Sequence, residues 1–353
     1  MKNNMFKRML TAALALTVTA ALAACGTTGG SSAAGSGAAA SASGAGSAAA
    51  PKDLPIIGIA QYGEHGSLDN CREGFLQGLE KAGLQEGVDY QLDYQNAHFD
   101  DTIDSQIAQA FSAENAALMV GIATPSAIAC FNAAEDKDIP VIFTAVTDPV
   151  EAKLDSGNVT GTSDKLPVEA QLDLIRQLQP EAKTIGIIYT TSEPNSVSAI
   201  AEYKEKAGDY GFTIDEIGVT AQSEVTQAAD KLIADGVDCF SNLTDNNVVG
   251  VLASILEKTN EAGIPVYGSE VEQVKLGCVA SAGLDYVQLG IQTGEMAAKI
   301  FRGEATCQDI PYETISEYGC YINSEALGAM EITMPEITEL AGTAVAVIEA
   351  SEA

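Results

Sequence analysis

The sequence predicts an α/β fold made of two doubly wound parallel-sheet lobes joined by a hinge. Three observations support this prediction. Apolar strand runs alternate with amphipathic helices, the alternation occurs twice along the chain, and one loop–helix–strand motif recurs in both halves. Such alternation is typical of parallel sheets that are covered by helices on both faces. The body of the chain, from about Pro55 to Pro335, is long enough for two domains of ordinary size.

The first half opens with a continuous apolar run at 56–60, which is typical of a buried strand. Apolar residues then recur at helical spacing, with Ser67 as the predicted N-cap and Gly83 as the predicted end of the helix. The further elements predicted for this half are a strand at 88–94, a helix through 103–111, a strand at 117–122, a short helix from Pro125 and a strand at 141–146.

The second half repeats the pattern. Its predicted elements are a strand at 185–189, a helix at 196–207, a strand at 212–219, a helix at 225–234, a strand at 237–241, a helix at 248–262 and strands at 264–267 and 278–281. The two halves share a repeated sequence motif. A polar loop at 124–126 precedes a helix and then an Ile-Pro-Val strand start at 139–141, and a loop at 244–246 is followed in the same way by Ile-Pro-Val at 264–266.

The C-terminal part predicts a hinge. The apolar-periodic helix at 284–301 follows a second sheet that is already complete, so we expect it to return to the first lobe. Several crossings between lobes are what a hinge requires. The predicted organisation is an N-terminal lobe of 55–160 plus about 284–308, a C-terminal lobe of 161–283 plus about 309–332, and an accessory tail at 333–353.

The first 25 residues predict export. Three cationic residues precede an apolar run at 9–24 that ends in Leu22-Ala23-Ala24-Cys25, the order of a secretory signal peptide at 1–24. The end of this run resembles a bacterial lipobox, which implies that Cys25 is lipidated. An ordinary signal peptide with an incidental Cys, or an uncleaved anchor, is the alternative. The stretch 26–50 contains only Gly, Ser, Ala and Thr, so 25–54 is predicted to be a flexible linker with a reach of roughly 25–30 Å.

Composition and motifs exclude several functions. The net charge of −31 argues against nucleic acid as a partner. Two His, and Cys residues without C-x-x-C or metal spacing, predict no metal site. A phosphate-binding loop, a dinucleotide fingerprint and a nucleophile elbow are all missing from the sequence, so no cofactor and no enzymatic activity are expected. Cys307 and Cys320 are close enough in sequence to suggest a disulfide, a question that the sequence leaves open.

A ligand site is expected beyond the carboxyl ends of the strands, where open parallel sheets bind ligands. The loops there are rich in hydroxyl, amide and carboxylate side chains. The alternative is that these residues only cap the helices that follow. The candidate ligand-binding residues are Tyr62, Glu64, His65, Thr124, Pro125, Ser126, Thr144, Ala145 and Asp148 in the first lobe, and Tyr189, Asn195, Thr244, Asp245, Asn246, Ser269 and Glu270 in the second.

The chemistry of these loops predicts a site for an α-amino acid. Hydroxyls and free N–H groups at helix N-termini suit a carboxylate, and we expect Thr124, Ser126, Thr144 and the N–H of Ala145 to bind it. A buried ammonium needs a carboxylate nearby. We expect Asp245 and Glu270 to fill that role, with Tyr62 and Tyr189 flanking an apolar or aromatic side chain.

At these loops the sequence resembles the tryptophan/tyrosine-type subfamily of ABC transporter substrate-binding proteins. The run Phe143-Thr144-Ala145-Val146-Thr147-Asp148-Pro149 is the most specific match, and the stretches that carry the resemblance are 64–65, 68–69, 72–75, 93–97, 121–125, 141–149, 157–161, 244–246 and 284–286. The resemblance implies a type I periplasmic-binding-protein fold and an aromatic amino acid as ligand. It also implies a monomeric lipoprotein outside the cell membrane that serves an ABC permease and its ATPase.

Three other functions stay open at this point. The chain could be a sensory receptor subunit that signals and imports nothing, a binding protein for another small solute such as a nucleoside, or an enzyme with an unrecognised site between the lobes.

Overall fold

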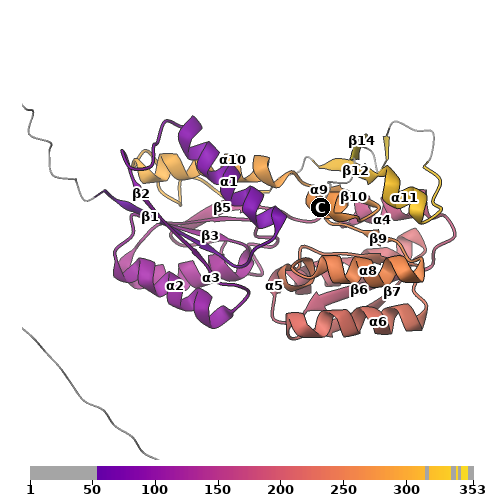
Figure 1. The fold of residues 1–353 in the computed structure, drawn as a ribbon. Helices are drawn as coiled ribbons and strands as arrows, with labels where there is room; N and C mark the ends of the chain where they lie inside the picture. Colours follow the sequence, from indigo (N-terminus) through magenta and orange to yellow (C-terminus); the bar gives the residue numbers. More distant parts are fainter. Residues whose placement is uncertain (1–53, 315–317, 335–338, 341–342, 349–353) are drawn as a thin grey trace, which may run out of the picture. The chain divides into compact units, whose positions relative to one another are not determined.

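The computed structural model describes residues 54–314, 318–334, 339–340 and 343–348. The signal peptide, the lipidated Cys25 and the linker expected up to residue 53 lie outside the described residues. The described chain forms two sheets with helices packed on both faces of each, as the alternating pattern predicts (Figure 1). The expectation of two α/β lobes dominated by parallel strands is confirmed.

The first sheet has the strand order β11-β5-β4-β3-β1-β2, and all its pairs are parallel. Helices α1 and α10 lie together on one face, and α2 and α3 on the other (Figure 1). Ile57, Ile59 and Phe143 are fully buried in this core. The elements are β1 (Ile56–Gln61), α1 (Gly66–Lys81), β2 (Gln91–Asn96), α2 (Asp101–Ala113), β3 (Leu118–Ile122), α3 (Thr124–Ala134), β4 (Val141–Thr144), β5 (Val159–Ser163), α10 (Tyr286–Phe301) and β11 (Glu313–Thr314).

Glycines explain why α10 belongs to the first lobe. A Cβ at Gly74 would overlap the carbonyl oxygen of Val287, and a Cβ at Gly294 would overlap that of Phe75. The backbones of α1 and α10 therefore touch, which only residues without a side chain permit. This contact fixes the return crossing that the sequence predicts.

The second sheet has the order β13-β14-β12-β10-β9-β8-β6-β7. The neighbours β10, β9, β8, β6 and β7 pair in parallel in that order, whereas β12 runs antiparallel to β10. The strands are β6 (Thr184–Thr190), β7 (Thr213–Val219), β8 (Cys239–Ser241), β9 (Val266–Tyr267), β10 (Ala280–Gly283), β12 (Gly319–Asn323), β13 (Glu339–Leu340) and β14 (Thr343–Ile348). The helices are α4 (Val168–Leu178), α5 (Pro194–Lys206), α6 (Val225–Asp235), α7 (Asn246–Val249), α8 (Leu252–Ala262), α9 (Val271–Leu276) and α11 (Ser324–Ala329).

Several elements differ from their predicted bounds. The strand expected at 88–94 begins only at Gln91, because Val88 lies in a turn and is 64% exposed. The strand expected at 141–146 ends at Thr144, since Ala145 has a φ of 56°. The helix expected at 248–262 is broken into α7 and α8 around Gly250. The strands expected at 264–267 and 278–281 lie at 266–267 and 280–283.

The crossings between lobes also differ from the expected boundaries. Strand β5 remains in the first sheet up to Ser163, and β11 pairs with it through Thr314, so the chain leaves the first sheet after 163 and 314 rather than at 160 and 308. The segment expected to be an accessory tail contributes β14, which pairs in parallel with β12. The apolar run at 343–348 becomes a strand through its pairing with β12, a contact that spacing along the chain does not show.

Six cysteines in the described chain are free and buried, Cys307 and Cys320 among them. Within the described ranges, no helix has the length and apolar character needed to cross a membrane. The same residues contain no cluster of His, Cys, Asp and Glu that would hold a metal ion.

Candidate functional site

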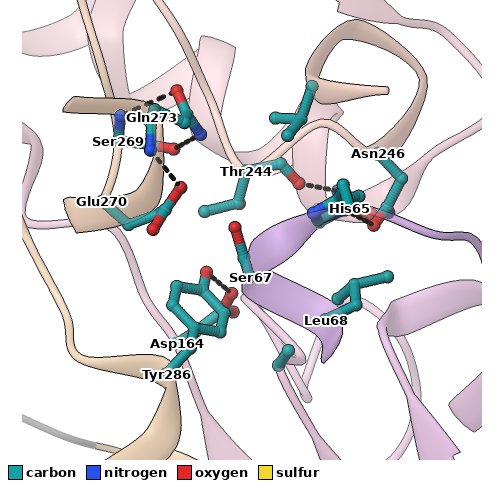
Figure 2. A pocket seen from close by; sticks show the side chains of 13 residues that line it. His65, Ser67, Leu68, Asp164, Thr244, Asn246, Ser269, Glu270, Gln273 and Tyr286 are labelled. Carbon is teal, nitrogen blue, oxygen red and sulfur yellow. Dashed lines mark hydrogen bonds between the residues drawn. The ribbon is translucent and has the colours of Figure 1, made fainter. Parts of the chain in front are cut away.

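A small cavity of about 20 Å³, enough for about one water molecule, lies between the two lobes, near the carboxyl ends of β4 and β9. Figure 2 shows the labelled side chains converging on it. The first lobe contributes His65, Ser67, Leu68, Ala145 and Tyr286, the second contributes Asn195, Thr244, Asn246, Val249, Ser269, Glu270 and Gln273, and Asp164 comes from the crossing between them.

Polar contacts hold the lobes together around the cavity. The hydroxyls of Thr147 and Thr244 share a hydrogen bond of 3.0 Å. Ser198 Oγ donates to Asp148 Oδ2 at 2.8 Å on the same rim. These groups come from opposite lobes, so the cavity is enclosed by both.

Asp164 is a buried acid at the hinge, 3% exposed. Its carboxylate accepts a hydrogen bond from Tyr286 Oη at 2.5 Å (Figure 2). It accepts a second from Thr147 Oγ1 at 3.0 Å. Burial raises the pKa of Asp164, whereas these two bonds oppose the rise. Because Asp164 follows the first crossing and Tyr286 the second, their bond ties two hinge segments together.

Glu270 is the second acid of the cavity, and it is 1% exposed. It caps α9 by accepting from the N–H groups of Glu272 and Gln273 at 2.6 and 3.0 Å, and it bonds the Ser67 side chain of the other lobe. Burial raises the pKa of Glu270 to about 7. No Lys or Arg is among the described residues that line the cavity. Within this described lining, its two acids therefore have no cationic side chain beside them.

Glu193 organises the second-lobe wall from behind. It is 1% exposed and accepts hydrogen bonds from Asn195 Nδ2 at 2.9 Å and from Asn246 Nδ2 at 2.7 Å. It also accepts from the backbone and side-chain nitrogens of Asn247 at 3.3 and 3.0 Å. Burial and the neighbouring Asp245 carboxylate raise its pKa, and the donated hydrogen bonds act against them. Glu193 thus fixes the side chains of α5 and α7 that reach the cavity.

Two alanines at the first-lobe strand ends have unusual backbone conformations. Ala123, just after β3, has φ 81° and ψ 157°, and Ala145, just after β4, has φ 56°. Positive φ is disfavoured for a residue with a Cβ and is concentrated at functional sites. The N–H of Ala123 donates to Thr144 O at 3.1 Å, which links the two strained turns. Ala145 lines the cavity directly.

The structure brings seven of the predicted residues to the cavity: His65, Ala145, Asn195, Thr244, Asn246, Ser269 and Glu270. The other nine do not line it: Tyr62, Glu64, Thr124, Pro125, Ser126, Thr144, Asp148, Tyr189 and Asp245.

Asp245 differs most from its expected role. It is fully buried and caps α7 by accepting from the N–H of Val248 at 2.9 Å. It also accepts from Thr190, through both N and Oγ1 at 2.5 and 2.9 Å, and from Ser196 Oγ at 2.6 Å. All its partners belong to its own lobe. The carboxylate is therefore an interior acceptor and is not available to an ammonium in the cavity.

Two of the hydroxyls expected to bind a carboxylate contact groups of the first lobe instead. Ser126 Oγ donates to Asp104 at 2.8 Å. Thr144 Oγ1 lies 3.3 Å from the sulfur of Cys71. Thr124 Oγ1 is buried without a partner, outside the cavity lining.

The two tyrosines expected beside the ligand have other surroundings. Tyr62 Oη donates to Asp101 at 2.9 Å, and its ring meets Phe99 edge-on. The Tyr189 ring lies next to Gly218, within the second sheet. Glu64 is exposed.

Sequence reasoning missed Ser67, Leu68, Asp164, Val249, Gln273 and Tyr286 in the lining, and Glu193 behind it. The missed acids did carry a signal, because Glu193 stands directly before α5 and Asp164 stands directly after β5. Their burial depends on contacts with distant segments, which spacing along the chain does not show.

Two α/β lobes with a cavity between them at the strand ends define a type I periplasmic-binding-protein structure. Residues 56–346 match the family model described as ABC transporter substrate binding protein, and the chain belongs to this family. Members of the family are extracytoplasmic substrate-binding proteins and not enzymes.

Relatives of the chain include proteins that are named for an aromatic amino acid or were solved with one. The chain is 39% identical over 282 residues to the "Tyrosine-binding protein" of Clostridioides difficile (strain R20291), covering 78% of this chain and 81% of that protein. An ABC domain of Streptococcus pneumonia solved in complex with L-Trp is 31% identical, with a TM-score of 0.77 over 80% of this chain and 96% of that one. The ligand-free, open structure of a substrate-binding protein with adhesive properties from Clostridium difficile is 36% identical, with a TM-score of 0.62 over 84% and 100%.

Proposed function

We propose that this chain is the lipid-anchored binding protein of an ABC importer and that it binds an aromatic L-amino acid between its lobes. The observation that carries the proposal is a cavity with two buried acids and no cationic side chain among the described residues that line it. A buried carboxylate without a counter-charge is costly, so the site suits a ligand that brings a positive charge. The tyrosine-binding relative and the L-Trp complex support an aromatic amino acid.

The acids of the cavity suit the ligand ammonium. Asp164 and Glu270 approach from the hinge and from α9, and each is held by hydrogen bonds that leave its carboxylate at the cavity. We assign the ammonium to this pair. This pair takes the role that the sequence suggested for Asp245, because the Asp245 carboxylate already accepts four hydrogen bonds from its own lobe.

The N-terminus of α1 suits the ligand carboxylate. His65, at the N-cap, makes no side-chain hydrogen bond to the helix, so the first N–H groups of this 16-residue helix are uncapped. Ser67 and Leu68 of its first turn line the cavity. Free N–H groups and the helix dipole both favour an anion at this position.

The arrangement of the lobes supports capture by closure. The chain is more similar in structure to the L-Trp complex than to the ligand-free, open relative, although the open relative has the higher sequence identity. Cross-lobe bonds such as Thr147–Thr244 would have to break for a ligand to enter. We infer that the lobes move apart to admit the ligand and then close around it.

Export and anchoring complete the proposal. A signal peptide ending before Cys25, followed by a Gly/Ser/Ala linker, suits a monomer tethered to the outer face of the membrane beside its permease and ATPase. If the anchor is a lipid on Cys25, the Cys25→Ser variant is released into the medium. Retention of that variant on salt-washed membranes would contradict lipid anchoring.

The ligand is tested by thermal unfolding of the mature chain with all amino acids, nucleosides and small sugars. A ligand at 100 times its dissociation constant adds about 2.7 kcal/mol to the stability of the folded state. We expect L-Tyr or L-Trp to give the largest shift in Tm. A shift with a nucleoside or sugar, and none with any amino acid, would reject the proposed ligand class.

A further inference from the structure

Two hydrogen-bond acceptors of the cavity lack a donor. The Nδ1 atom of His65 and the Oδ1 atom of Asn195 are buried, and neither has a partner among the described residues. Both residues line the cavity. Buried polar atoms in folded proteins nearly always have a partner, so these two atoms point to groups that a ligand supplies.

The hydrogen bonds of Glu193 determine that His65 Nδ1 and Asn195 Oδ1 are both hydrogen-bond acceptors. Its carboxylate draws the Nδ2 donors of Asn195 and Asn246 toward itself, at 2.9 and 2.7 Å, which leaves the amide oxygens facing away from it. The Oδ1 of Asn246 lies 3.4 Å from His65 Nε2, so Nε2 must carry the proton in order to donate. His65 Nδ1 then has a free lone pair. Burial lowers the pKa of His65 to about 4, which keeps the ring neutral at physiological pH.

Packing fixes the direction of the His65 acceptor. The His65 ring is stacked on Phe99, with centroids 6.4 Å apart and ring planes 8° from parallel. A side chain at Gly63 would overlap the Phe99 ring, so Gly63 provides the space that Phe99 occupies. An acceptor held by a stack on one side and by Asn246 on another cannot turn to find a different partner.

The unpartnered acceptor of His65 and the acids lie on different sides of the cavity. Figure 2 shows His65 and Asn246 on one side of Ser67, and Glu270 with the Asp164–Tyr286 pair on the other. An ammonium bound by the acids would leave the acceptors to the opposite end of the ligand. In an aromatic amino acid, that end is the tip of the side chain.

We propose that His65 Nδ1 and Asn195 Oδ1 form a donor-reading subsite, which selects a ligand whose side chain ends in an O–H or N–H over one of equal shape without that donor. The inference rests on the proposed function and adds the specificity-determining residues. A phenol or an indole donates its one hydrogen to one of the two acceptors, whereas a phenyl ring leaves both of them buried and unpaired. Such a loss corresponds to about 5- to 150-fold in affinity.

The unmodified protein provides the first test, by calorimetry with matched pairs of ligands. L-Tyr is compared with L-Phe, and L-Trp with its benzothiophene analogue, which has sulfur in place of the indole N–H. We expect at least one pair to show the donor-free member bound at least fivefold more weakly. Ratios below fivefold in both pairs overturn the proposal. Failure of all four compounds to bind would instead reject the aromatic amino acid ligand itself.

The second test uses His65→Phe, which keeps a ring against Phe99 and removes the acceptor. We expect weaker binding of the donor ligand and unchanged binding of its donor-free analogue, so that the ratio falls toward one. Equal weakening of both would place His65 at the ammonium and overturn the proposal. His98→Asn is the control, because His98 is exposed and lies outside the cavity, and its ratio should equal that of the parent.

Discussion

Asp245 and Glu270 occupy equivalent places in the second lobe, yet their surroundings give them different roles. Each follows a strand at the carboxyl edge of the sheet and caps a short helix, α7 for Asp245 and α9 for Glu270. Asp245 accepts all its hydrogen bonds from its own lobe. Glu270 accepts two from α9, and its third partner, Ser67, lies across the cavity.

The difference shows what makes a helix-capping acid available to a ligand. A carboxylate whose lone pairs are filled by its own lobe is a structural acceptor, however close it lies to the binding edge. A carboxylate whose remaining lone pairs face the other lobe contacts a ligand that the two lobes enclose. Three measurements test this comparison, in order of decreasing expected effect.

Glu270→Gln tests the ligand-facing acid. The amide oxygen can still accept from the N–H groups of α9, but the charge that faces the ligand ammonium is lost. Breaking a buried charge pair costs about 3–5 kcal/mol, or roughly 10²–10³-fold in affinity, and calorimetry with L-Tyr or L-Trp measures it. Glu272→Gln makes the same charge change on α9 outside the cavity lining and should bind normally. Binding by Glu270→Gln within a few-fold of the parent would show that Asp164 alone holds the ammonium.

The pH dependence of stability sharpens the same point without ligand. The pKa of Glu270 is raised to about 7 in the folded protein, whereas its ordinary value is 4.5. Between these values the unfolded chain has released the proton that the folded chain retains. Stability from this group is therefore complete below pH 4.5 and decreases by about 3 kcal/mol as the pH rises to 7. In urea unfolding, the stability of the parent relative to Glu270→Gln should fall across this window; a constant difference would contradict the assignment.

Asp245→Asn tests the structural acid. An Asn side chain keeps one acceptor oxygen and places an NH₂ among donors from Thr190 and Ser196. We expect a loss of about 2 kcal/mol of unfolding free energy, in the range for hydrogen bonds to a charged group. The affinity of the folded variant should stay within a few-fold of the parent. A loss of affinity comparable to that of Glu270→Gln would show that Asp245 acts on the ligand after all.

Local periodicity explains which elements could be predicted. Helices α1, α5 and α6 and strands β1, β6 and β7 have strong apolar patterns, and they lie close to the predicted positions. The errors occur where a contact or a backbone conformation overrides the pattern. Strand β4 stops before Ala145 because that residue has a positive φ. Strands β11 and β14 exist through pairing with β5 and β12, segments far away along the chain.

The sequence by itself determined the alternation of elements, the two lobes and the edge at which polar loops gather, because these follow from patterns within a few residues of one another. It also supplied His65, Asn195, Asn246 and Glu270 as candidates from their loops. Only the tertiary structure decided which acids face the cavity. That choice depends on donors from distant segments, such as Thr190 for Asp245 and Tyr286 for Asp164, since a carboxylate is available to a ligand only where its own lobe leaves it unsatisfied.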